Sequence, residues 1–124
     1  MVIDTCILID FLRAKDKSQT ELFSLSKLNE LFVSAVTLYE LYMGATTDLK
    51  KQEVKLLTNG LIVLPFDEEV SAKAAEIYHQ LKSKHQSVEF RDIFIAATCI
   101  INKMSIKTLN VKHFSPISEF KIIN

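Results

Sequence analysis

Three acids and one amide stand in this sequence where their side chains could share a ligand. Asp4 closes the apolar run MVID and Asn110 closes IKTLN, so each ends a predicted strand. Glu40 lies six residues past the apolar run LFVS, and Asp92 lies in the first turn of a very apolar predicted helix. Oxygen ligands of these kinds suit Mg²⁺ or Mn²⁺. Such an ion lowers the pKa of a bound water and stabilises charge on a reacting phosphodiester.

Each of these residues also has a simpler structural explanation. Asp4 could cap the helix that follows it, and Thr37 with Glu40 fits a capping box. Asp92 could satisfy free amides at a helix N-terminus, and Asn110 could be a turn residue. Three carboxylates gathered together repel and raise one another's pKa. Their convergence at one place would therefore call for a cation.

The predicted elements decide whether these residues meet. Short apolar runs alternate with helical patterns along the chain: strands at 1–4, 31–34, 61–66, 106–110 and 120–123, and helices at 5–13, 18–29, 35–43, 47–59, 67–84 and 89–103. This alternation predicts an α/β protein, a three-layer α/β/α fold with a roughly five-stranded, mainly parallel sheet and helices on both faces. Ligands of such folds bind beyond the carboxyl ends of the strands.

Several helix ends carry sequence signals of their own. Ser18 begins a capping-box pattern that predicts a helix extending to about Asn29. Gly44 stands where a helix-ending glycine would. Asp67 can cap the helix that follows it.

Length and composition limit the class of protein. The chain has 124 residues, which predicts one domain over 1–124. Two cysteines, Cys6 and Cys99, lie in apolar runs and indicate buried thiols in a reducing compartment. The longest apolar stretch, 93–101, is too short for a bilayer span of about 20 residues. We therefore expect a cytoplasmic protein with no membrane association.

Charge is balanced over the whole chain but not around the candidate site. There are 15 basic and 15 acidic residues, so a strongly basic nucleic-acid clamp is excluded as a global description. Without Asp4, Glu40 and Asp92, 15 basic groups face 12 acidic groups, a balance of +3. Basic residues near the predicted site could follow a phosphate backbone: Arg13, Lys15, Lys17, Lys103, Lys107, Lys112 and His113.

Four segments together resemble the PIN-domain ribonucleases, and most closely the VapC toxins of bacterial type II toxin–antitoxin modules. They are VIDTCILIDFL, TLYELYMGA around Glu40, RDIFIAATCI around Asp92 and TLNVKHF around Asn110. They occur in the order and spacing of that family, from Val2 to about Ile117. Any one segment is a weak signal, whereas all four together are specific.

The resemblance implies a metal site built from Asp4, Glu40 and Asp92. The family often has an acid where Asn110 stands, and asparagine, which also occurs there, can hydrogen-bond a water or a phosphate oxygen but supplies no negative charge. A second tightly held metal is therefore in doubt. Thr5 and Thr108 flank the site, where their hydroxyls could orient carboxylates or a phosphate, or merely cap backbone.

The implied activity is Mg²⁺- or Mn²⁺-dependent cleavage of single-stranded or loop RNA. An activated water attacks phosphorus in line and leaves 5′-phosphate and 3′-hydroxyl ends. We expect Asp4 and Asp92 to contact the metal directly. Whether Glu40 binds metal directly, binds it through water or acts as a base stays open at this point.

The resemblance also implies protein partners. Family members commonly form homodimers and bind an antitoxin, here a VapB-like protein, that lays an extended or helical segment over the site and often inserts a basic side chain. Large side chains around Glu40, among them Tyr39 and Met43, cover more than one helix face and suit a dimer contact.

Other charged residues have less specific interpretations. Asp10 is expected to be exposed or paired on its helix, and the three histidines, His79, His85 and His113, to be solvated surface. Arg91 could neutralise Asp92 or touch RNA.

Other functions fit less well. A haloacid-dehalogenase-type phosphotransferase needs a second Asp two residues after Asp4, where this chain has Cys6. A nucleotide-binding switch needs a glycine-rich phosphate loop, and the sequence has none. The alternative that remains is a catalytically silent PIN-like module that binds RNA or a protein.

Overall fold

Five short parallel strands form one sheet at the centre of the computed structural model, which describes residues 1–28 and 30–123. They are β1 (Val2–Ile3), β2 (Phe32–Ser34), β3 (Ile62–Leu64), β4 (Ile106–Lys107) and β5 (Ile122–Ile123). Their order in the sheet is β3-β2-β1-β4-β5, and each neighbouring pair is parallel. The predicted five-stranded sheet is confirmed.

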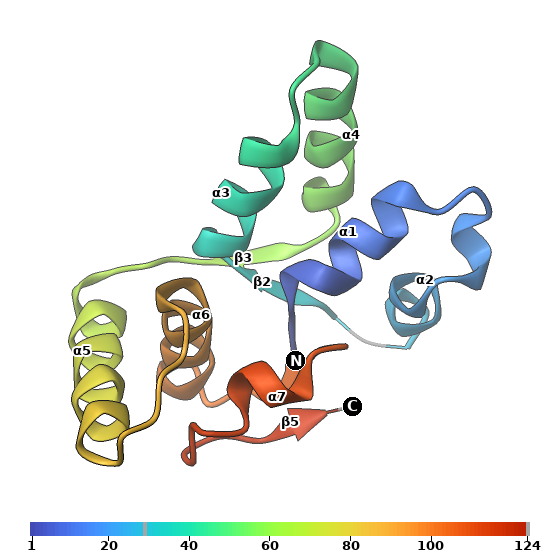
Figure 1. Ribbon diagram of the computed structural model, residues 1–124. Helices are drawn as coiled ribbons and strands as arrows, with labels where there is room; N and C mark the ends of the chain where they lie inside the picture. The colour runs from blue at the N-terminus through green and yellow to red at the C-terminus, as the bar shows by residue number, and fades with distance from the viewer. Residues whose placement is uncertain (29, 124) are drawn as a thin grey trace.

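The helices lie on both sides of this sheet (Figure 1). They are α1 (Thr5–Arg13), α2 (Glu21–Ser26), α3 (Ala35–Gly44), α4 (Asp48–Asn59), α5 (Glu68–Ser83), α6 (Phe90–Ile101) and α7 (Val111–Phe114), with a 3-10 turn at Lys17–Gln19. Figure 1 shows α5 and α6 together on one side, α1 and α2 on the other, and α3 and α4 as an upright pair. Within the described residues, no helix is both long and apolar enough to cross a membrane.

The alternation of side chains along β1 separates two apolar cores. Val2 faces the cluster that α5 and α6 complete, which includes Ile77 and Ile95. Ile3 faces the cluster formed with α1, α3 and α4, which includes Ile7 and Leu41. Successive strand residues point to opposite faces, so a strand buried on both faces must be apolar throughout. The predicted three-layer α/β/α arrangement is confirmed.

The start of α5 agrees with the sequence signal, whereas the start of α2 does not. Asp67 caps α5 as predicted, since its Oδ1 accepts the Val70 amide at 3.0 Å. The predicted start at Ser18 is wrong, because Thr20 caps α2 instead. Asp16 accepts the Ser18 amide and begins a separate 3-10 turn as its N-cap. The predicted end at Asn29 lies outside the described residues.

Helix ends and late strands differ more from prediction. Gly44 is the last residue of α3, with Ala45 as C-cap, and no described glycine has a positive φ. The predicted strand 106–110 keeps only Ile106–Lys107, because the chain then turns into the unpredicted helix α7. The residues after β4 are thereby freed from the sheet to line its edge.

The strand order reverses its direction at β1. The two sheet neighbours of β1, β2 and β4, are reached by crossovers that run in opposite directions. Ligand sites of open parallel sheets lie at such a reversal, beyond the carboxyl ends of the strands. Asp4 follows β1 at this edge, and its amide donates to the Lys107 carbonyl of β4 at 3.0 Å.

Candidate functional site

Asp4 is held by three donors. Its Oδ1 accepts the Thr5 amide at 2.8 Å, so it caps α1 as the structural alternative predicted. Its Oδ2 accepts the Thr108 hydroxyl at 2.6 Å and the Cys6 thiol at 3.3 Å. The side chain is buried at the edge of the sheet. Capping therefore fixes the orientation of this carboxylate and does not exclude a role in a site.

Glu40 projects from α3 toward the same edge. Its Oε1 accepts the Thr5 hydroxyl at 2.9 Å, and its Oε2 lies 3.4 Å from Nη1 of Arg91. The capping box suggested for Thr37 and Glu40 is wrong, because α3 begins at Ala35 with Ser34 as its N-cap. Glu40 thus lies within the helix and is free to face α1.

Asp92 is the carboxyl whose charge is most strongly disfavoured. Burial in the first turn of α6, together with repulsion from Asp4 and, more weakly, from Glu40, raises its pKa to about 6. His113 and Arg91 act in the opposite direction, and Nδ1 of His113 lies 3.4 Å from Oδ2 of Asp92. Arg91 and His113 only partly offset the effects of burial and of the other acids on the pKa of Asp92.

Asn110 lies next to this cluster through its backbone. Its amide donates to the Thr108 hydroxyl at 3.0 Å, and Thr108 in turn donates to Asp4. The residue itself is exposed and does not cap α7 through its side chain. Thr108 is fully buried and connects β4 to the carboxylate that ends β1.

The fold brings Asp4, Glu40 and Asp92 into one electrostatic neighbourhood. Thr5 touches both Asp4 and Glu40, and both acids raise the pKa of Asp92. As the side chains stand, no three His, Cys, Asp or Glu residues of the described chain are grouped so that they could hold a metal ion.

The donor chemistry of the cluster nevertheless fits a divalent cation. Mg²⁺ is commonly bound through one or two carboxylates with waters completing its shell. Asp4 and Asp92 offer such a pair, and a cation between them would relieve the repulsion that raises the pKa of Asp92. Both carboxylate oxygens of Glu40 already have partners in Thr5 and Arg91. Glu40 therefore suits a contact with the cation through water, or a role as proton acceptor.

Two nitrogen-bearing side chains beside the acids, Arg91 and His113, have roles that the sequence left open or missed. Arg91 is half exposed and bridges Glu40 and Glu89, while its charge also lowers the pKa of Asp92. His113 is exposed as predicted, and the structure adds a contact to Asp92 that the sequence did not reveal. Its position three residues after Asn110, just past a predicted strand end, was the available signal.

The remaining polar predictions divide between surface and interior. Asp10, His79 and His85 are exposed as predicted. The prediction that Lys107 could contact phosphate is wrong. Lys107 is buried on the α2 side of the sheet, and its Nζ lies 3.1 Å from Glu21.

Two side chains of the cluster, Cys6 and Thr37, were interpreted from the sequence only as a buried thiol and as part of a capping box. Cys6 is half-buried, with its thiol against Asp4 and Thr108, and burial raises its pKa. Thr37 is fully buried, and its hydroxyl lies 3.0 Å from that of Thr5. A position three residues before Glu40 on a helix was the signal for Thr37, since residues three apart share a helix face.

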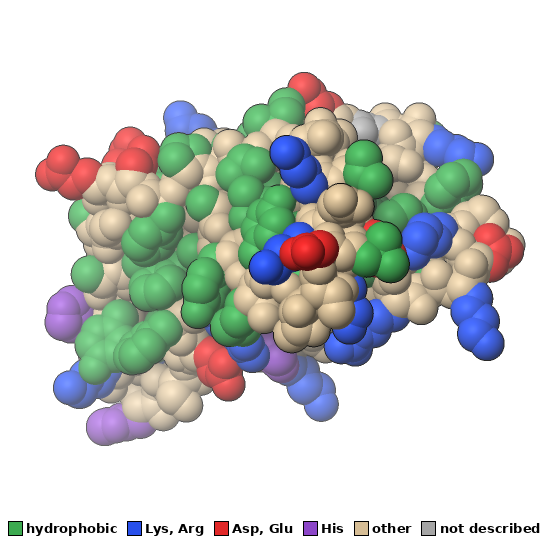
Figure 2. All heavy atoms as spheres, turned by 90° about the horizontal axis from the view of Figure 1, so that it is seen from above, with side chains coloured by type: hydrophobic (Ala, Val, Ile, Leu, Met, Phe, Trp, Pro, Cys, Tyr) green, Lys and Arg blue, Asp and Glu red, His purple; other side chains and the backbone are tan. Residues whose placement is uncertain are grey.

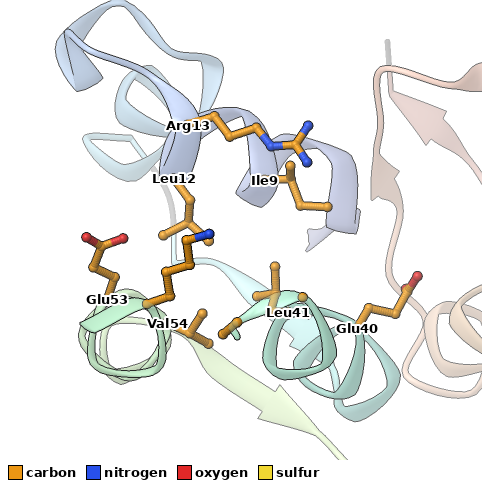
Figure 3. A pocket seen from close by; sticks show the side chains of 10 residues that line it. Ile9, Leu12, Arg13, Glu40, Leu41, Glu53 and Val54 are labelled. Atoms are coloured by element: carbon orange, nitrogen blue, oxygen red, sulfur yellow. The ribbon is translucent and has the colours of Figure 1, made fainter. Parts of the chain in front are cut away.

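A groove between α1, α3 and α4 leads to Glu40 (Figure 3). Its volume is about 210 Å³. Apolar side chains point into it from all three helices, among them Ile9, Leu12, Leu41 and Val54, with Arg13, Lys50 and Glu53 also lining it. We call it the α1–α4 groove.

A second hollow, of about 480 Å³, lies on the other side of Glu40. Tyr39 and Met43 of α3, Phe66, and Phe90 and Phe94 of α6 form what we call the aromatic face. Figure 2 shows hydrophobic side chains gathered in this region, toward the α5 side of the molecule. Tyr39 and Phe90 are each 66% exposed, which is unusual for large apolar side chains.

Comparisons with known proteins point in one direction. A family profile described as the PIN domain matches residues 1–115. Ribonuclease VapC1 of Methanocaldococcus jannaschii is 28% identical over 120 residues, covering 97% of this chain and 82% of that protein. Ribonuclease VapC10 of Mycobacterium tuberculosis is 29% identical over 121 residues, covering 98% and 90%.

Solved structures give the same picture of the fold. VapBC2 from Rickettsia felis, bound to a DNA fragment of its promoter, matches with a TM-score of 0.86 at 21% identity, covering 99% of this chain and 96% of the other. VapBC-1 from nontypeable Haemophilus influenzae matches with a TM-score of 0.85 at 24% identity, with the same coverage. DNA-bound VapBC from Salmonella typhimurium has a TM-score of 0.81 at 25% identity, covering 98% and 95%.

Proposed function

Because this chain belongs to the PIN domain family, we propose that it is an endoribonuclease and the toxin of a toxin–antitoxin pair. The observation that carries the proposal is the buried Asp92 carboxyl, with a pKa raised to about 6, beside Asp4 and Glu40 at the edge of a parallel sheet. Curated relatives named as VapC ribonucleases support the activity. We further propose that 1–124 acts as one domain, in the cytoplasm, where its two free thiols would stay reduced.

Asp4 and Asp92 would hold a divalent cation, Mg²⁺ or Mn²⁺, directly. When bound, the ion supplies a water of lowered pKa and offsets negative charge on the phosphodiester. Thr108 and Cys6 hold one oxygen of Asp4, so the carboxylate keeps its orientation without the ion. The chemistry of the oxygen donors suits either cation.

Other side chains would act on the RNA and on the proton. Glu40 can accept the proton of the attacking water at Oε2, the oxygen that faces Arg91. Arg91 is half exposed and can donate to a phosphate oxygen. The side-chain amide of Asn110, which is exposed, can hydrogen-bond a water or a phosphate oxygen.

The purified chain is expected to cleave unstructured RNA internally in Mg²⁺ or Mn²⁺, with 5′-phosphate and 3′-hydroxyl ends on the products. Excess EDTA should stop cleavage, because the carboxylates alone cannot stabilise a developing anion, and added Mn²⁺ should restore it. Gel assays with end-labelled RNA and a 5′-phosphate-dependent exonuclease measure both outcomes. Cleavage that survives EDTA would refute the metal requirement, and RNA binding without cleavage would favour the silent-module alternative.

The partner of the toxin would be a VapB-like antitoxin. Several solved structures with this fold are described as VapBC or toxin–antitoxin complexes. The α1–α4 groove leads to Glu40 and offers apolar side chains such as Leu12 and Val54, which suit an amphipathic segment. A basic side chain at the end of that segment would meet the acidic cluster and block the RNA.

A second copy of the chain would cover the aromatic face. Tyr39, Met43 and Phe90 are more exposed than large apolar side chains usually are, and they surround one hollow. Dimer interfaces are enriched in aromatic residues and methionine. We therefore propose a homodimer through α3 and α6.

Phe90→Glu is expected to convert the dimer into a monomer, because two buried carboxylates would face each other across the interface. Leu56→Glu on α4 is the matched control, since Leu56 is 74% exposed and lies outside the aromatic face. Light scattering coupled to size-exclusion chromatography measures both masses. An unchanged mass for Phe90→Glu would place the interface elsewhere.

A further inference from the structure

Thr37 stands at the end of a chain of hydroxyl groups that reaches Glu40. It is fully buried on α3, and its Oγ1 lies 3.0 Å from Oγ1 of Thr5. The Thr5 hydroxyl lies 2.9 Å from Oε1 of Glu40. Three polar groups from two helices are thereby linked in a buried or part-buried line.

The number of available hydrogens determines which group donates in each of these two hydrogen bonds. A carboxylate accepts hydrogen bonds only, and a threonine hydroxyl has one hydrogen to donate. If Thr5 gives its hydrogen to Glu40, it can only accept from Thr37. Thr37 must therefore donate to Thr5, and the two dipoles align toward the Glu40 carboxylate. Hydrogen bonds in such a chain strengthen one another, most of all when the final acceptor is charged.

We infer that Thr37 is a positioning residue that acts on Glu40 through Thr5. Thr5 is the shared contact of the site, since its amide binds Asp4 while its hydroxyl binds Glu40. Thr37 holds the Thr5 hydroxyl from the opposite side. This chain of hydroxyl groups, which we call the relay, therefore sets the position of the Glu40 carboxylate relative to Asp4. It leaves Oε2 of Glu40 facing Arg91.

The inference rests on the proposed ribonuclease function only in what Glu40 does next. The relay itself is a property of the folded protein without metal or RNA. Its test can therefore be divided into a part that needs cleavage and a part that does not.

The cleavage part compares Thr37→Val, which keeps the side-chain shape and removes the hydroxyl, with Thr37→Ser, which keeps the hydroxyl and removes the methyl group. Thr37→Val should lower kcat for RNA cleavage about three- to tenfold, the value of one such hydrogen bond, with KM changed less than about twofold. Thr37→Ser should restore kcat to within about twofold of the parent. Equal loss in both variants would assign Thr37 to packing, and an unchanged kcat in Thr37→Val would overturn the inference.

The second part is a double-mutant cycle of Thr37→Val with Glu40→Ala, measured by urea unfolding in EDTA. Thr37→Val should lower the folding equilibrium constant less in the Glu40→Ala background than in the parent, with a coupling of about three- to tenfold. Additive effects would overturn the inference. If the parent chain cleaves no RNA while the coupling is present, the proposed function fails and the link between Thr37 and Glu40 stands.

Discussion

The Asp92→Asn variant is expected to lose RNA cleavage by about a thousandfold while it keeps its fold. The substitution preserves the shape of the side chain and removes one of the two carboxylates proposed to hold the metal. Loss of a single group that stabilises charge in a transition state commonly costs about a hundred- to a thousandfold. Asp4→Ala is expected to have the same effect, since Asp4 is the other proposed ligand.

Asp10→Asn is the matched control for this experiment. Asp10 belongs to the same N-terminal segment as Asp4, but it is exposed on α1. The same chemical change there should leave the cleavage rate and the growth arrest of expressing cells unchanged. Circular dichroism of all three proteins checks the fold. Parent-like cleavage by pure Asp92→Asn protein would remove the basis of the proposed site.

The same Asp92→Asn variant is expected to be more stable than the parent at neutral pH without metal. The pKa of Asp92 is raised to about 6 in the folded protein, from an ordinary value of 3.8. The folded state therefore binds a proton between these pH values that the unfolded state does not. Its stabilising contribution is fully present below about pH 4 and is lost as the pH rises through 6.

The size of this effect follows from the shift. One pKa unit corresponds to about 1.4 kcal/mol, so removing the charge should stabilise the metal-free protein by about 1–3 kcal/mol at pH 7.5. At pH 4 the difference between variant and parent should nearly vanish, because Asp92 is then protonated in the parent. Urea unfolding in EDTA at both pH values measures this difference, and the comparison cancels groups common to both proteins.

Added Mg²⁺ and the Asp10→Asn control variant provide two further tests of the stability prediction. Mg²⁺ should stabilise the parent and not Asp92→Asn, because only the parent binds it in the folded state. Asp10→Asn should show neither the gain at pH 7.5 nor the pH dependence. A less stable Asp92→Asn protein at pH 7.5 would mean that the carboxylate is compensated within the protein and has no need of a cation.

Much of this fold follows from local features of the chain. The boundaries of α1 match the prediction, since an apolar segment follows a capping Asp4. All five strands lie within the predicted runs, because short apolar segments that alternate with helices favour a buried parallel sheet. The resemblance predicted Asp4, Glu40 and Asp92 as the site, and their positions at or just beyond the strand ends made a shared edge foreseeable.

The tertiary structure alone decided how these residues are connected. His113 meets Asp92, Arg91 turns to Glu40 and Thr37 reaches Glu40 through Thr5, and no local pattern by itself specifies these partners. Lys107 was misjudged for the same reason: the face of β4 on which it lies depends on pairing with β1.

The physical reason is the range of the forces involved. Caps and hydrophobic periodicity act over a few residues, so the sequence determined the elements and the acids at their ends. Burial, charge repulsion and hydrogen-bond direction depend on groups far apart in the chain, such as Asp4 and Thr108, which only the strand order β2-β1-β4 brings together. That order, rather than any segment, raises the pKa of Asp92 and gives the site its chemistry.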